Sequence, residues 1–278
     1  MITIVLTAIA LILLFTALET LLWWSTWRQK SPTIPTATPP WETALVFITG
    51  ISDYTQESLD PEQIDLINKI SQVYAIDRII AEPFPWKHFS NKTSIIFKIW
   101  NILHLKPLPL WVMSLHNFWQ TILILGFTNY YGKDIAHCLL NPIGLPKSNS
   151  SQLIFLSGST GTGMALASLP HLKKYLPCKL MIISYGGVFG LSPGLNDVDQ
   201  FFHLLGNQDH WAKLAEIILL NRGNISTAFT KAQQEKRLFI ISTGEHKHLD
   251  YLSDRHSQNQ LKTNLQLTLE TILNLKIL

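Results

Sequence analysis

A strand that runs straight into a turn of small residues and then a helix is encoded at residues 153–163, and no other stretch constrains the fold as much. The sequence there is LIFLSGSTGTG, an apolar run that ends in glycine, serine and threonine. A helical pattern follows from about Gly161 to Tyr175. Because a tight strand-to-helix turn has room only for small side chains, the pattern predicts a strand that ends at a sheet edge and leads directly into a helix.

The same alternation continues along the chain and predicts the fold class. Apolar runs of strand length alternate with helical patterns, which is typical of βαβ units in a parallel sheet. We therefore predict an α/β fold with a mostly parallel, doubly wound sheet. The expected strands are 44–49, 76–81, 152–156, 180–184, 201–205 and 238–242. One expected helix begins after Asp60 as its N-cap, with Pro61 at the first position and Gln63 completing a capping-box-like pattern. The other expected helices are 92–105, 110–125, 131–140, 161–175, 209–220 and 261–275.

The N-terminal segment 1–30 is predicted to be a transmembrane anchor. From Ile2 to Trp24 there are 23 residues whose only charge is Glu19, enough to span a bilayer core of about 30 Å. Aromatic and basic residues of the kind found at membrane interfaces close the segment: Trp23, Trp24, Trp27, Arg28 and Lys30. A cleaved signal peptide is the alternative, but no basic start or small-residue cleavage site is clear. We expect a retained single-pass anchor in contact with the lipid bilayer, and a cytoplasmic C-terminal domain.

The rest of the chain divides into a tether and one domain. Residues 31–40 hold four prolines, which indicates an extended, stiff tether. The domain is expected over 41–278, with a helical insertion at about 86–151 that forms either extra core helices or a lid or membrane-resting cap over a site.

Composition excludes several functions. The formal net charge of +3 is too small to indicate a nucleic-acid partner. The two cysteines, Cys138 and Cys178, lack the spacing of metal ligands and are expected to be buried thiols, and no HExxH pattern is present. We therefore expect no metal.

The turn after strand 152–156 contains two candidate nucleophiles. Ser159 is flanked at two positions on either side by Ser157 and Gly161, a variant of the G-x-S-x-G pattern in which a strained turn exposes a serine. Thr160 is the alternate, but a β-branched side chain is disfavoured in such a turn. We choose Ser159, with an unreactive turn serine as the other interpretation.

An acid and a base follow in the order that serine hydrolysis needs. Asp209 closes the run HLLGNQD after strand 201–205, where it is either the acid or a helix N-cap. Asp197 and Asp199 are alternatives. His246 follows strand 238–242 and is our choice of base, with His248 as its alternate.

With nucleophile, acid and histidine in this order, the chain from about Trp41 to Leu252 resembles the α/β-hydrolase superfamily of serine esterases and lipases. The resemblance implies that Ser159 attacks an ester-type carbonyl, His246 carries the proton and Asp209 orients the imidazole. It also implies an oxyanion hole made by backbone amides, those of Thr160 and of the loop Gly50, Ile51 and Ser52. The substrate expected beside a membrane anchor is a small hydrophobic ester or a lipid. The alternative is a catalytically inactive α/β-hydrolase fold that serves as a membrane-attached binding or scaffold module.

The glycines of residues 158–163 also invite two nucleotide-binding interpretations. A Walker A motif needs a lysine where Met164 stands. A dinucleotide-binding loop should follow the first strand of its fold and be followed by an acidic residue, whereas here two βα units precede it and Ser184-Tyr185-Gly186 ends the next strand. We expect no cofactor.

Overall fold

The structure is a computed structural model that describes residues 2–28, 38–48, 59–81, 102, 110–190, 192–213, 225–256 and 261–275. Its strands are β1 (Thr43–Ile48), β2 (Arg78–Ile80), β3 (Gln152–Gly158), β4 (Lys179–Tyr185), β5 (Gln200–Leu205) and β6 (Leu238–Ser242). Its α-helices are α1 (Ile2–Trp27), α2 (Pro61–Val73), α4 (Leu110–Gly126), α5 (Thr128–Ile143), α6 (Thr160–Leu172), α8 (Ile225–Gln234) and α9 (Asn264–Leu273), and η2 (Pro193–Asn196) is a 3₁₀ turn.

The strands form one six-stranded sheet in the order β2-β1-β3-β4-β5-β6, with every pair parallel. The predicted α/β class is confirmed. The chain steps from β1 to β2 on one side and returns to place β3 on the other side of β1, so the strand order reverses between β1 and β3. Ligands of open parallel sheets bind at the carboxyl ends of the strands beside such a reversal. β3 ends there, immediately before Ser159.

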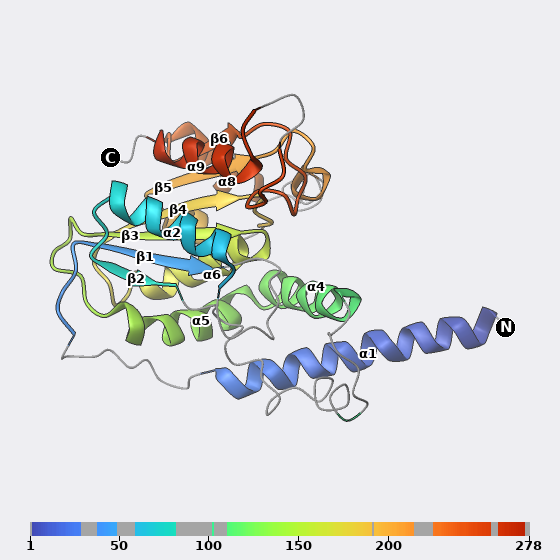
Figure 1. The fold of residues 1–278 in the computed structure, drawn as a ribbon. Helices are drawn as coiled ribbons and strands as arrows, with labels where there is room; N and C mark the ends of the chain where they lie inside the picture. The colour runs from blue at the N-terminus through green and yellow to red at the C-terminus, as the bar shows by residue number, and fades with distance from the viewer. Residues whose placement is uncertain are drawn as a thin grey trace.

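Helices cover both faces of the sheet, as its side-chain alternation requires (Figure 1). In β1, Leu45 and Phe47 pack into a core with α2 and α9, whereas Ala44, Val46 and Ile48 pack into a second core with α5, α6 and α8. Helix α2 begins as its sequence predicts, with Asp60 donating its backbone N–H to the Gln63 side chain at 3.2 Å. Both cores are apolar and fully enclosed.

The insertion contributes a core helix. Helix α5 lies directly on α6, so close that a Cβ on Gly132 would stand 2.1 Å from the carbonyl oxygen of Ala167. Helix α4 leads away from the sheet toward α1 (Figure 1). The expected helix at 92–105 lies outside the described residues apart from Ile102.

Helix α1 is long and apolar enough to cross a membrane, by length and composition. Its C-terminal end is also part of the domain. Trp23 and Trp27 are 0% and 4% exposed and belong to the core that holds α5 and α6. Trp24 donates its indole N–H to Asp134 of α5 at 2.9 Å. Trp23 and Trp27 are therefore packed against protein.

Candidate active site

Ser159 stands between β3 and α6 in a strained backbone conformation, with φ +46° and ψ −126°. A side chain rarely adopts a positive φ of this kind unless its surroundings hold it there. Here the Ser159 N–H donates to the Tyr185 carbonyl at 3.3 Å, and the Ser159 carbonyl accepts from the Val188 N–H at 2.8 Å. Gly158 is needed beside it, because a Cβ there would lie 2.4 Å from the Tyr185 ring. The turn thus has the strained geometry that the sequence pattern predicted for Ser159.

Beneath the turn, buried hydroxyl groups form a chain that accommodates the departure from glycine at Ser157. The Ser157 Oγ lies 3.1 Å from Thr162 Oγ1, which lies 2.8 Å from Ser184 Oγ. Ser184 Oγ in turn lies 3.3 Å from His203 Nδ1. Burial lowers the pKa of His203 to about 4, with Asp209 opposing the shift, so this histidine is neutral at pH 7. These buried hydroxyl contacts were not predicted from the sequence.

The structure brings His248 to Ser159. The Ser159 Oγ lies 2.9 Å from His248 Nε2, and His248 Nδ1 lies 3.1 Å from both carboxylate oxygens of Asp209. Since an ionised carboxylate can only accept, Nδ1 must carry the imidazole proton. Nε2 is then free to accept from the Ser159 hydroxyl.

Asp209 is fully buried and held by several donors besides His248. Its Oδ1 accepts the Ala212 N–H at 2.9 Å, which makes it the predicted N-cap of the following turn as well. Its Oδ2 accepts the Tyr251 hydroxyl at 2.8 Å. Burial by itself raises the pKa of Asp209, but the hydrogen bonds from His248, Ala212 and Tyr251 outweigh it and hold the pKa below the ordinary aspartate value. Asp209 is therefore a carboxylate at neutral pH. Tyr251, which supports it, was not found from the sequence.

The preferred histidine, His246, is not the one beside Ser159. Its side chain is fully buried, and its Nδ1 lies 2.9 Å from Asn264 Oδ1 at the start of α9. Its ring packs on Tyr251, with ring centroids 5.1 Å apart. The turn after β6 thus sends His246 into the core and leaves His248 partly buried beside Ser159, although both follow the same strand.

The alternative acids lie elsewhere. Asp199 accepts the backbone N–H of Leu180 at 2.7 Å, and Asp197 lies 3.8 Å from the Lys173 ammonium. Leu180 is at the start of β4, so Asp199 is at the opposite end of the sheet from Ser159.

Of the residues predicted to supply oxyanion donors, the structure describes Thr160. Thr160 is the first residue of α6, where a backbone N–H has no partner within the helix. Its side chain is only 7% exposed, and no described residue bonds its Oγ1, so it is badly placed as a nucleophile. Gly50, Ile51 and Ser52 lie outside the described residues.

Two cavities open beside His248 and Leu249. The first has a volume of about 570 Å³ and contains Ser159, Tyr185 and Tyr251, with Asp60 and Glu62 of the α2 start at its edge. The second, of about 600 Å³, is lined by Trp211 and Lys247 among others. Of the described parts of α4 and α5, no residue lines either cavity.

Comparison with known proteins leaves the family open. No protein-family model matches the chain, and no curated protein matches it. Among solved structures, the crystal structure of carboxyl esterase 2 from the mycorrhizal fungus Tuber melanosporum is 11% identical, with a TM-score of 0.43, over 86% of this chain and 78% of that chain. A likeness so distant carries no argument about activity.

Proposed function

We propose that this chain is a membrane-anchored serine hydrolase that acts on a carboxylic ester through Ser159, His248 and Asp209. The observation that carries the proposal is the unbroken contact from the Ser159 Oγ through both ring nitrogens of His248 to the buried carboxylate of Asp209. The strained backbone at Ser159 supports it, since such strain is kept where it positions a reacting group.

In the proposed reaction His248 is the general base. Its Nε2 takes the Ser159 hydroxyl proton as Oγ attacks the ester carbonyl, and it then gives that proton to the leaving alcohol. An acyl-serine remains. His248 next deprotonates a water that attacks the acyl carbon, and returning the proton to Ser159 Oγ releases the acid. Asp209 keeps Nδ1 protonated throughout and stabilises the imidazolium.

The oxyanion that forms at the carbonyl needs backbone donors. We assign one to the Thr160 N–H at the positive end of α6. The loop of Gly50, Ile51 and Ser52 remains the proposed source of the second.

Helix α1 is proposed as a retained anchor, with the catalytic domain on the cytoplasmic side. Burial of Trp23 and Trp27 in the domain core supports retention, because α1 can leave only if two side chains are withdrawn from that core. The substrate proposed beside such an anchor is a hydrophobic ester.

The test is fluorophosphonate labelling of the full chain in detergent micelles, with the adduct located by peptide mass spectrometry. We expect the adduct on Ser159 and none in Ser159→Ala. His248→Ala should slow labelling by about 100-fold or more, the range of general-base catalysis. His246→Asn, checked for folding by circular dichroism, is the matched control and should label like the parent chain.

Other results would change the assignment. Loss of labelling in His246→Asn but not in His248→Ala would return the base to His246. No adduct on the folded parent chain would overturn the hydrolase and favour the membrane-attached binding module.

A further inference from the structure

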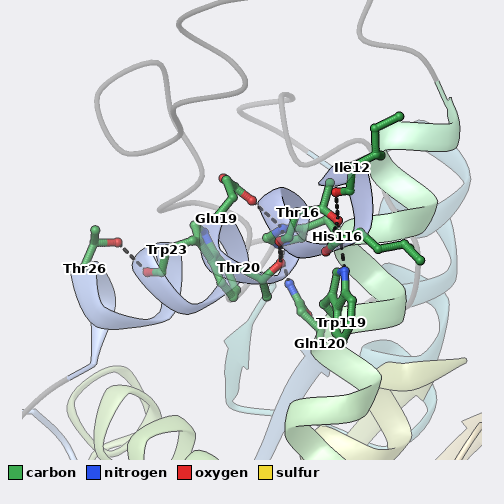
Figure 2. A network of polar contacts seen from close by, with 10 residues as sticks. Ile12, Thr16, Glu19, Thr20, Trp23, Thr26, His116, Trp119 and Gln120 are labelled. Carbon is green, nitrogen blue, oxygen red and sulfur yellow. Dashed lines mark hydrogen bonds and ion pairs between the residues drawn. The ribbon is translucent and has the colours of Figure 1, made fainter. Parts of the chain in front are cut away.

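Helices α1 and α4 are joined by a buried polar network (Figure 2). Glu19 of α1 and His116 of α4 are 3% and 2% exposed, with Glu19 Oε2 at 3.2 Å from His116 Nδ1. The Thr20 hydroxyl lies 3.2 Å from the same nitrogen. One turn away, Trp119 donates its indole N–H to the Thr16 hydroxyl at 2.9 Å. The only charged residue of the apolar span therefore faces α4, as an ionisable side chain at membrane depth must face a partner.

The length of α1 that stands free of the domain is too short for a bilayer. The 14 residues Ile2–Phe15 precede Thr16, the first residue bonded to α4. They rise about 21 Å, whereas the hydrocarbon core is about 30 Å thick. The apolar surface of α1 continues through Leu18 and Leu22, both at least 50% exposed. A bilayer that covers this surface must therefore reach the level at which α4 is docked.

Helix α4 has an outer face suited to that position. Phe118 and Ile122, one turn apart, are 49% and 40% exposed. In sequence they lie next to His116 and Trp119, whose side chains bond to α1. The helix Leu110–Gly126 contains no Asp, Glu, Lys or Arg. The outer face of α4 is thus apolar and uncharged, like the exposed surface of α1.

The candidate active site lies at the same end of the molecule as the projecting half of α1. In Figure 1 the N-terminal half of α1 projects beyond the edge of the sheet at which the strands end, the edge that carries Ser159. Two large apolar side chains are exposed in the segments that follow β5 and β6 at this edge, Trp211 at 69% in a helical turn and Leu249 at 74% in a turn. Both line a cavity beside His248.

We propose that the lipid bilayer contacts the outer face of α4 and the edge bearing Trp211 and Leu249, in addition to α1. The domain then rests on the membrane with its candidate active site opening toward the lipid. Building on the proposed function, the ester would enter from the bilayer, as part of a membrane lipid.

Quenching by lipid tests the contact without reference to activity. A cysteine carrying an environment-sensitive fluorophore is placed at Phe118 or Leu249, in a chain whose Cys138 and Cys178 are alanine and which unfolds cooperatively. The chain is inserted into phosphatidylcholine nanodiscs with brominated acyl chains. Leu21 is the positive control within α1. Val73, 56% exposed at the end of α2, is the matched negative control.

We expect fluorescence at Phe118, Leu249 and Leu21 to fall at least twofold relative to unbrominated lipid, and that at Val73 to stay unchanged. Quenching at Leu21 alone would overturn the proposal. A Phe118 label shielded from both brominated lipid and aqueous iodide would also overturn it, and would point to a second protein chain on α4.

Entry of the ester from the bilayer is tested separately, by measuring hydrolysis. Phe118→Glu should reduce hydrolysis of an ester embedded in nanodiscs at least tenfold and leave fluorophosphonate labelling unchanged, with Phe118→Leu as the control. Equal hydrolysis by Phe118→Glu and Phe118→Leu would contradict entry from the bilayer. If the parent chain neither labels nor hydrolyses esters, the proposed function fails, and the quenching result still decides the membrane contact.

Discussion

The Tyr251 hydroxyl donates a 2.8 Å hydrogen bond to Asp209 Oδ2, and its oxygen accepts the Gly206 N–H at 2.8 Å. Burial, with Asp209 next in effect, raises the pKa of Tyr251, so the phenol remains a donor throughout the working pH range. Gly186, at φ +55°, leaves room for the Tyr251 ring, since a Cβ on residue 186 would lie 2.5 Å from it. Tyr251 is thus a positioning residue for the buried carboxylate.

Tyr251→Phe should slow labelling of Ser159 by about tenfold, because a hydrogen bond to a charged group contributes about 1.5–3 kcal/mol. Loss of this donor raises the pKa of Asp209, so labelling should also fail at a higher pH on the acid side than in the parent chain. Labelling rates from pH 4 to 8 measure both effects. Tyr185→Phe, in the same cavity, is the control, and an equal effect of the two variants would contradict the positioning role.

Ser159→Gly should be more stable than Ser159→Ala. Both variants lack the hydroxyl, but alanine keeps a Cβ at φ +46° while glycine adopts this conformation freely. The strain is expected to make the difference about 1 kcal/mol in the free energy of unfolding. Urea unfolding in micelles measures it. An alanine variant as stable as the glycine variant would show that the turn is unstrained.

His203 should make stability depend on pH. In the unfolded chain it takes a proton near pH 6.5, whereas the folded chain keeps it neutral to about pH 4. Between these values the unfolded state binds a proton that the folded state does not, so the free energy of unfolding falls as the pH falls. The loss attributable to His203 should approach about 3 kcal/mol at pH 4.

His203→Gln should show a shallower decline between these pH values when both chains are unfolded in urea. Asp209 contributes its own acid-side loss to both chains, because its lowered pKa stabilises the folded state only while it is ionised. That contribution cancels in the comparison. Parallel pH curves would mean that the pKa of His203 is the same in the folded and unfolded chains.

Trp23→Ala should destabilise the whole domain by about 3–5 kcal/mol, the cost of removing a large core side chain. Leu11→Ala on the same helix, where the side chain is 60% exposed, should change the melting temperature in micelles by much less. If the two variants melt alike, α1 is not part of the domain core.

The inner strands of the sheet could be predicted because they are buried on both faces and read as continuous apolar runs, as Phe155 and its neighbours show. Ser159 and Asp209 could be proposed for a related reason: each follows a strand in a turn that contains a glycine. The choice between His246 and His248 could not be made. It depends on Asn264, which is distant in sequence and bonds the first of them.

The role of α1 was also beyond the sequence. Its three tryptophans match an interfacial belt in composition, but Tyr131 and Asp134 of α5 turn them inward through ring contacts and a hydrogen bond. The sequence of α1 itself contains no pattern that predicts packing of its tryptophans against α5. Hydropathy describes the helix, whereas its partners depend on the fold of the insertion.

The burial of Trp23 and Trp27 changes what a protease could achieve at this protein. The proline-rich segment between α1 and β1 is the obvious place for a cut that sheds a domain from its anchor. Here such a cut would sever the chain and leave the two fragments clasped together through those indoles and the Glu19–His116 pair. Separating the domain from α1 therefore requires the shared core to open, so a cut in this segment alone does not release the proposed anchor.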